Sequence, residues 1–167
     1  MLIAVGMKQS VRILGRRISH YGLLDVFMKK NDLKHQVTEA ISACQDKKAE
    51  EIAILELDQE SGAFTDYFLV CSGSNPRQVQ AIADEVQLRL KKVAGLYAHN
   101  VEGYKQAEWV LLDYVDFVVH VFSEKARKFY DLERLWKSAK RLEAADLAVK
   151  AEKAKRVATR AVRKKRA

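Results

Sequence analysis

The run from Asp66 to Cys71, Asp-Tyr-Phe-Leu-Val-Cys, most constrains the fold of this 167-residue chain. Its apolar and β-prone residues do not alternate with polar ones, which is typical of a strand covered on both faces. The segment 72–76 follows at once, where Asn75 suits a helix N-cap and Pro76, the only proline, suits the first helical position. A buried strand that leads directly into a helix predicts an α/β fold.

Apolar spacing predicts the other elements of a small mixed sheet flanked by helices. We expect helices over 33–49 and 76–93, and strands over 51–58, 66–71, 97–103, 109–113 and 116–122. A last helix is expected after Ser123, which is a suitable N-cap. Because neither glycine nor proline follows Gly103, this helix could continue past Leu147 into the C-terminal tail.

The charges divide the chain into three parts. Residues 1–33 carry a net charge of +4, residues 34–136 carry −5, and residues 137–167 carry +9. We therefore expect a basic N-terminal extension over 1–32, one domain over 33–137, and a basic tail, helical or disordered, over 138–167. An acidic domain suits a basic partner, and basic extensions suit nucleic acid or another anionic surface.

Several classes of protein do not fit the sequence. No apolar run reaches the roughly 18–20 residues needed to span a bilayer, so a membrane protein is not expected. The only two cysteines, Cys44 and Cys71, lie inside apolar patterns and predict buried thiols rather than a disulfide framework or a zinc site. Residues 1–27 are either a targeting segment or, as we favour, a short appendage before Met28, and we expect a bacterial cytoplasmic protein.

Motifs over residues 65–136 resemble a known family. They are Thr65-Asp-Tyr-Phe, Ser72-Gly-Ser-Asn, the run from Gly103 to Phe122, and Tyr130-Asp-Leu-Glu-Arg-Leu-Trp136. In this order and spacing they resemble the ribosomal silencing factor family, also called Iojap, over about residues 33–137. The resemblance implies a small α/β domain related to nucleotidyltransferases. It also implies a protein that binds the large ribosomal subunit through its fourteenth protein, blocks subunit joining and reduces translation when nutrients are short.

The expected contact residues gather around the strand 109–113. Strand alternation places Trp109, Leu111 and Asp113 on one face, with Tyr114 on the other. An aromatic anchor beside carboxylates suits a basic ribosomal protein. The resemblance assigns the partner surface to Trp109, Tyr114 and Asp116, although Trp109 could instead pack in the core.

Other residues near this strand have competing interpretations. Family members usually carry glycine where this chain has Val115, so we expect a wider turn or a displaced Tyr114, because a positive φ strains valine. His120 is interpreted as a hydrogen-bonded structural residue of its strand. Asp66 and Glu133 are further contact candidates, or simply a strand-start acceptor and a solvated helix residue.

Two other functions remain as alternatives. Gly73-Ser74 after an apolar strand also occurs in nucleotidyltransferases, but the paired carboxylates that such enzymes need do not follow, and Asp113 with Asp116 is a poor substitute. We therefore expect no catalysis, no metal and no cofactor. A general RNA-binding protein could act through the tail at 150–166, which in our favoured reading adds contacts to ribosomal RNA. Exposed strand edges make a homodimer plausible.

Overall fold

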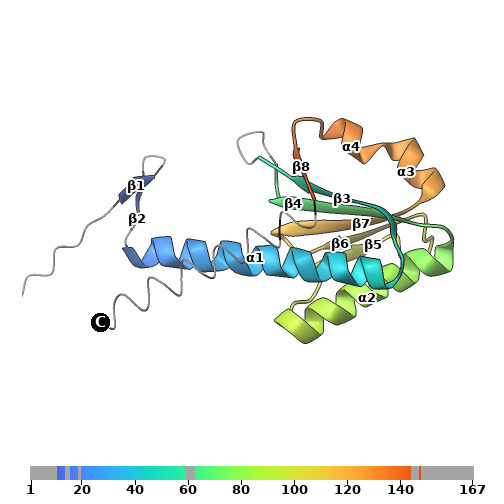
Figure 1. The fold of residues 1–167 in the computed structure, drawn as a ribbon, viewed down its shortest axis with the longest axis horizontal. Helices are drawn as coiled ribbons and strands as arrows, with labels where there is room; N and C mark the ends of the chain where they lie inside the picture. The colour runs from blue at the N-terminus through green and yellow to red at the C-terminus, as the bar shows by residue number, and fades with distance from the viewer. Residues whose placement is uncertain (1–10, 14–15, 19, 59–62, 144–146, 148–167) are drawn as a thin grey trace, which may run out of the picture.

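The computed structural model describes residues 11–13, 16–18, 20–58, 63–143 and 147. β1 and β2 form a hairpin, and β3 to β8 form a six-stranded sheet in the order β5-β6-β7-β4-β3-β8. The helices α1 and α2 lie on one face of this sheet, with α3 and α4 on the other (Figure 1). The elements are β1 (Val11–Ile13), β2 (Arg16–Ile18), α1 (His20–Asp46), β3 (Glu50–Glu56), β4 (Tyr67–Gly73), α2 (Pro76–Ala94), β5 (Asn100–Glu102), β6 (Trp109–Asp113), β7 (Phe117–Ser123), α3 (Glu124–Tyr130), α4 (Leu132–Leu135) and β8 (Lys140–Leu142).

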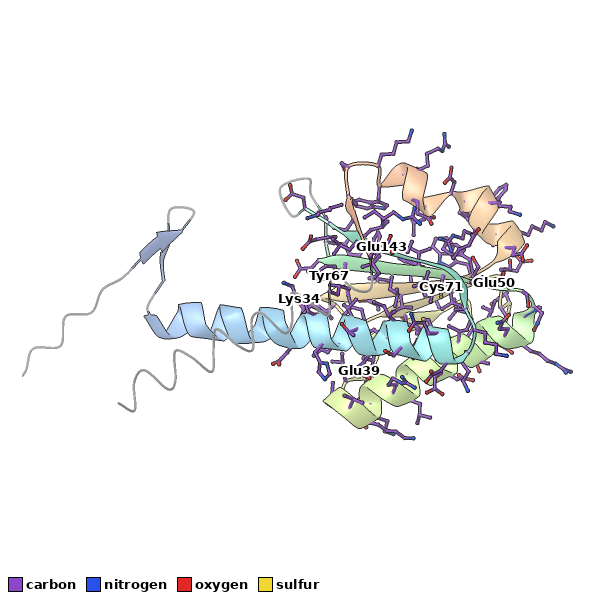
Figure 2. The ribbon with its side chains drawn as sticks, viewed as in Figure 1. Lys34, Glu39, Glu50, Tyr67, Cys71 and Glu143 are labelled. Carbon is purple, nitrogen blue, oxygen red and sulfur yellow. The ribbon has the colours of Figure 1, made fainter. Side chains whose placement is uncertain are left out.

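The sheet is mixed, as the sequence predicts, because β4 and β7 run parallel while the other neighbours run antiparallel. β4 lies inside the sheet, and all seven of its residues are buried. Tyr67 and Cys71 belong to the core beneath α1 and α2, where Figure 2 labels them, whereas Phe68 and Val70 belong to the core on the opposite face. The prediction of a strand covered on both faces is confirmed.

The strand-to-helix segment also forms as its sequence predicts. The Asn75 side chain accepts a hydrogen bond from the Gln78 N–H at 2.9 Å, and α2 starts at Pro76. The helix ends at Gly95, whose φ of +63° is the left-handed conformation that glycine adopts at helix ends. Gly73 allows close packing here, because a Cβ atom would lie 2.9 Å from the Val79 side chain.

Two helices differ from the sequence-based expectation. α1 begins at His20 rather than at residue 33. The buried residues from Leu33 to Cys44 hold the C-terminal part of this helix on the sheet. Once that part has formed, each further residue towards the N-terminus adds one backbone hydrogen bond, so the helix can extend beyond its buried part. The expected long C-terminal helix is wrong. α3 ends at Tyr130, since Asp131 adopts a φ of +44°, and the four-residue α4 follows.

Instead of a helix, residues 140–142 form an edge strand of the sheet. β8 pairs antiparallel with β3, with Ile54 opposite Leu142. Leu142 and Leu147 are both buried in the core shared with α1 and α2. Burial of these two side chains and the edge hydrogen bonds outweigh helix propensity. The sheet thus includes residues 140–142 of the tail expected over 138–167, while residues 148–167 of that tail lie outside the described residues.

The N-terminal segment contains structure that the sequence did not suggest. β1 and β2 pair antiparallel with Arg12 opposite Arg17, and the hairpin lies at the far end of α1 from the sheet (Figure 1). Within the described residues, no helix is both long and apolar enough to cross a membrane.

Candidate functional site

The face of the sheet opposite α1 and α2 carries a connected group of aromatic side chains. Neighbouring rings in this group have centroids 4.8 to 6.5 Å apart. Within this group Phe68 and Phe122 are buried, whereas Phe64 and Phe129 are 73% and 80% exposed. We call this group the aromatic surface; its members are Phe64, Phe68, Trp109, His120, Phe122, Phe129, Tyr130 and Trp136.

Trp109 is half-buried in the aromatic surface at the start of β6. Its ring stacks on Phe122 at 4.9 Å and contacts Tyr130 at the same centroid distance. Its indole N–H donates a hydrogen bond to Nδ1 of His120 at 3.2 Å. Because the polar atom already has a partner, the indole is held in place with part of its surface open to a ligand.

The strand alternation separates the expected contact residues into two groups. Leu111 and Asp113 are half-buried and lie on the same face of β6 as Trp109. Tyr114 is buried on the other side, where it stacks on Phe117 at 4.8 Å. The structure therefore does not bring Tyr114 together with Trp109. Burial raises the pKa of the Tyr114 phenol, which keeps this group neutral.

The connection between β6 and β7 is a tight turn centred on Val115. The Asp116 N–H donates to the Tyr114 carbonyl at 2.9 Å, an i to i+2 bond that defines a γ-turn. Val115 has a φ of +70°, so the expectation of a wider turn is wrong, while a displaced Tyr114 stays a prediction. Asp113 Oδ1 accepts from the Val115 N–H at 2.7 Å, and the exposed valine side chain avoids a clash with the core. The Asp66 N–H donates to the Asp116 carbonyl, which places both acidic residues beside the turn.

Replacing Val115 with glycine is expected to stabilise the protein. Glycine tolerates a positive φ, and the relief of strain at a β-branched residue should exceed the added entropy of the unfolded chain by about 1 kcal/mol. Urea unfolding would measure this gain. The control is Val101→Gly in β5, where φ is not positive and the same change should destabilise the protein. Equal losses in both variants would contradict the assignment of strain to Val115.

His120 is the buried polar member of the aromatic surface, and it is hydrogen-bonded as the sequence predicts. Its Nδ1 atom accepts the Trp109 indole proton, so the neutral ring carries its own proton on Nε2. The Nε2 atom is buried without a hydrogen-bond partner among the described residues. The ring meets Phe68 edge to face at 4.8 Å. Burial lowers the pKa of His120 to about 4.

This lowered pKa predicts a loss of stability in acid. The unfolded chain binds a proton at His120 near pH 6.5 and the folded protein only near pH 4, so stability falls as the pH drops through this range. Between pH 7 and pH 4 the wild type should lose about 3 kcal/mol more than His120→Gln, which keeps an acceptor for Trp109 but does not titrate. Urea unfolding at both pH values would measure the difference. A similar acid loss in both proteins would show that His120 does not couple to folding.

Arg127 on α3 is a buried residue that the sequence did not single out. Its guanidinium donates to the Glu51 carbonyl at 2.6 Å and to Ser72 Oγ at 3.1 Å, and it forms a close ion pair with Glu133. Glu133, an expected contact residue, thus has its carboxylate engaged inside the fold. Residues six apart point in different directions on one continuous helix. Only the break at Asp131 brings this pair together.

The features that suggested a nucleotidyltransferase have structural roles. Ser74 Oγ donates to the Gln78 side chain at 2.8 Å, and Gln78 in turn donates to the carbonyls of Lys47 and Lys48 at the end of α1. Among the residues that the structure describes, no three histidine, cysteine or acidic side chains lie close enough to hold a metal ion. The nucleotidyltransferase relationship stays a prediction.

Comparison with known proteins agrees with the motifs. Residues 30–167 match the protein family described as "Ribosomal silencing factor during starvation". A ribosomal silencing factor from Halalkalibacterium halodurans is 47% identical over 107 residues, which cover 62% of this chain and 87% of that protein. One from Bacillus subtilis is 44% identical over 100 residues, which cover 60% of this chain and 83% of that protein.

A solved structure shows the same fold. The crystal structure of a protein from Chromobacterium violaceum is 37% identical in sequence and superposes with a TM-score of 0.58. The match covers 62% of this chain and 84% of that one. Because the family model matches residues 30–167 and these relatives share the motifs and the fold, the chain belongs to the ribosomal silencing factor family.

Proposed function

We propose that this protein binds the large ribosomal subunit through that subunit's fourteenth protein, blocks joining with the small subunit and so represses translation. The observation that carries the proposal is the aromatic surface around Trp109. Interface residues that contribute most to binding are typically aromatic side chains held in packed settings with part of their surface open. Trp109 meets this description, because Phe122 and Tyr130 pack against its ring and His120 accepts its indole N–H.

Charge supports a basic partner. The segment 34–136 carries a net charge of −5, and Asp113 and Asp116 lie at the turn next to the face that bears Trp109 and Leu111. Opposite charges on two proteins accelerate their encounter and fix their orientation. Asp66 lies beside the same turn and extends the acidic edge. Tyr114 would act by supporting this turn from the core rather than by touching the partner.

The proposed mechanism is steric and non-catalytic. A protein seated on the subunit-joining face of the large subunit excludes the small subunit by its volume, without a cofactor. The bacterial relatives named ribosomal silencing factors support this role, and they favour a cytoplasmic setting.

The test is subunit joining on a density gradient. Purified subunits would be mixed with wild type, Trp109→Ala or Tyr97→Ala, the last being an exposed aromatic residue beside α2. Wild type and Tyr97→Ala should travel with the large subunit and deplete joined ribosomes. Trp109→Ala should bind at least about 30-fold more weakly, the loss expected for a dominant interface residue.

Two outcomes of this experiment would contradict the proposal. If wild type neither travels with the large subunit nor reduces joining, the proposed function is wrong. A cooperative thermal transition in Trp109→Ala would show that its weaker binding does not come from unfolding. Loss of that transition would place Trp109 in the core instead.

We also propose that the basic tail adds contacts to the ribosomal RNA backbone. Because Leu142 and Leu147 are buried in the core, a truncation that tests the tail should remove only residues 148–167. It should cause a partial loss of subunit binding that is largest at low salt, since phosphate contacts release counterions. Complete loss at every salt concentration would instead favour a general RNA-binding protein.

Self-association is a separate part of the proposal. β5 lies at one edge of the sheet and all three of its residues are exposed, so two copies could pair through this edge. Analytical ultracentrifugation would measure the mass, and Val101→Pro should abolish any dimer that uses this edge.

A further inference from the structure

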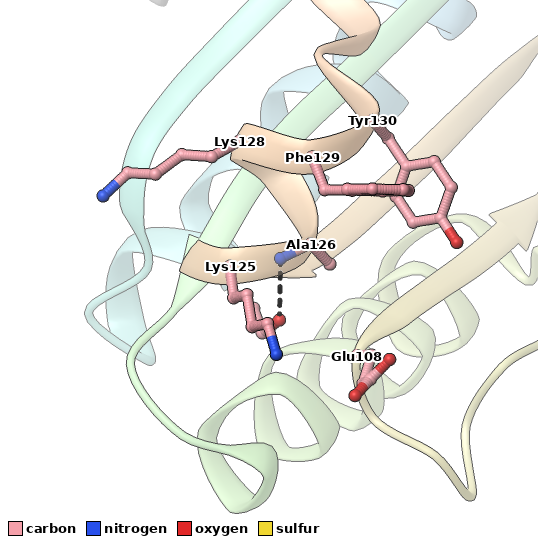
Figure 3. Close-up of a pocket in the computed structure, with 7 residues that line it drawn as sticks. Glu108, Lys125, Ala126, Lys128, Phe129 and Tyr130 are labelled. Atoms are coloured by element: carbon pink, nitrogen blue, oxygen red, sulfur yellow. Dashed lines mark hydrogen bonds between the residues drawn. The ribbon is translucent and has the colours of Figure 1, made fainter.

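The short helix α3 exposes an aromatic ring and carries two lysines near it. Phe129 is 80% exposed, although it is a large apolar residue, and Lys125 and Lys128 are also exposed. A pocket of about 510 Å³ lies here, within the size range of roughly 300–1,000 Å³ that is usual for ligand pockets. Figure 3 shows the side chains around it. They are Glu108, Ser123, Lys125, Ala126, Lys128, Phe129 and Tyr130.

The Phe129 ring is supported from behind. It meets Tyr130 edge to face with centroids 5.0 Å apart, and Tyr130 rests on Trp109 at 4.9 Å. The other surface of the Phe129 ring is open to solvent and contributes little to the core. A supported ring with an open surface is suited to stacking against a planar ligand.

The two lysines place positive charge beside this ring. Lys125 and Phe129 are four residues apart, which places them on the same side of α3. In Figure 3 the Lys125 and Lys128 side chains extend from α3 in different directions, with Glu108 across the pocket from α3. The arrangement offers an exposed apolar ring with two lysines on the same short helix, both of which line the pocket.

We propose that α3 forms a stacking platform for an unpaired RNA nucleotide, with the base on Phe129 and the neighbouring phosphates on Lys125 and Lys128. Every base has a flat surface, so such a platform accepts any base, while lysines follow the phosphate backbone. Glu108 can accept a hydrogen bond from a base amino group or a 2′-hydroxyl.

Charge favours RNA over a basic protein at this place. The surrounding segment is acidic overall, but this pocket is lined by two lysines and one glutamate. With two lysines and one glutamate, the charged lining sums to +1, which favours a phosphate backbone over a basic protein. The platform lies at the Phe129 end of the aromatic surface, next to Trp109 through Tyr130, and its lysines distinguish it from the acidic edge at Asp113 and Asp116. It does not depend on the proposed silencing function.

The experiment uses the full chain and two labelled probes of equal charge. One is a single-stranded uridine hexamer, and the other is a hexamer with the same backbone but no bases. Fluorescence anisotropy would compare wild type, Phe129→Leu, Phe129→Tyr and the control Tyr97→Leu at about 50 and about 200 mM salt. The tail is present in every variant, so its backbone contacts cancel in the comparison.

Phe129→Leu should bind the uridine hexamer about 5- to 100-fold more weakly at both salt concentrations and should bind the baseless strand as wild type does. Phe129→Tyr and Tyr97→Leu should match wild type. Replacing Lys125 and Lys128 together with glutamine should weaken both probes and reduce the salt slope by about 1.4.

Two outcomes would overturn the proposal. In the first, Phe129→Leu binds both probes as wild type does. In the second, Phe129→Leu binds RNA normally but fails to travel with the large subunit on a gradient, which would make Phe129 a contact for protein. Failure of the silencing function would appear separately, as wild type that binds the uridine hexamer but leaves subunit joining unchanged.

Discussion

Gly103→Ala is expected to lower the free energy of unfolding by about 3–4 kcal/mol, because it combines backbone strain with a collision that cannot relax. Gly103 follows β5 with a φ of +72°. A Cβ atom here would lie 1.9 Å from the Trp109 carbonyl oxygen, which belongs to the backbone of β6. Relief would require β5 and β6 to separate or Trp109 to move.

Gly95→Ala is the matched control for this prediction. Gly95 has a similar φ of +63°, but a Cβ atom there meets nothing within 4 Å. Its replacement should cost only about 1 kcal/mol, the cost of a left-handed conformation at a residue with a side chain. Urea unfolding would measure both variants, and the difference between them isolates the collision. Equal losses would show that the loop at Gly103 moves away without penalty.

Arg127→Met should be the second strongly destabilising change, with a loss of about 3 kcal/mol, because it leaves buried partners without their donor. Arg127 is 8% exposed, and its guanidinium serves the Glu51 carbonyl, the Ser72 hydroxyl and the Glu133 carboxylate together. These groups come from β3, β4 and α4, so the side chain ties α3 and α4 to the sheet.

Arg134→Met tests whether burial causes this effect. Arg134 pairs with Asp131 at 3.0 Å, but its side chain is 68% exposed, and its loss should cost no more than about 0.5 kcal/mol. Chemical unfolding of both variants gives the comparison. The double change Arg127→Met with Glu133→Gln should cost less than the sum of the single changes, because it removes the unpaired charge as well. Similar losses for the two arginines would contradict the buried network.

Some features of the site were predictable because they repeat along the chain. Alternation in 109–113 places Trp109, Leu111 and Asp113 together, and the structure keeps them on one face. The same alternation places Tyr114 on the core side of the sheet, although the family resemblance assigned it to the partner surface. The aromatic surface was not predictable in this way, because Phe64, Trp109 and Trp136 are far apart in the sequence and show no common spacing.

The valine in the tight turn shows how tertiary structure can override a local preference. Valine disfavours a positive φ, and the sequence therefore suggested a different turn. The ladder between β6 and β7, together with the hydrogen bonds of Asp113 and Asp116, holds the turn closed regardless. The strain affects the backbone of one residue, whereas several hydrogen bonds between β6 and β7 oppose it, so the turn keeps its tight conformation.

The sequence by itself determined the elements whose signals are local: the buried strand β4, the capped helix α2, and the motifs that identify the family. Tertiary structure alone decided that residues 140–142 form an edge strand and that Arg127 meets Glu133. The physical reason is the sequence separation over which each interaction acts. Caps and apolar periodicity act over a few residues, whereas burial of Leu142 and pairing with β3 depend on a sheet that forms only when distant segments meet.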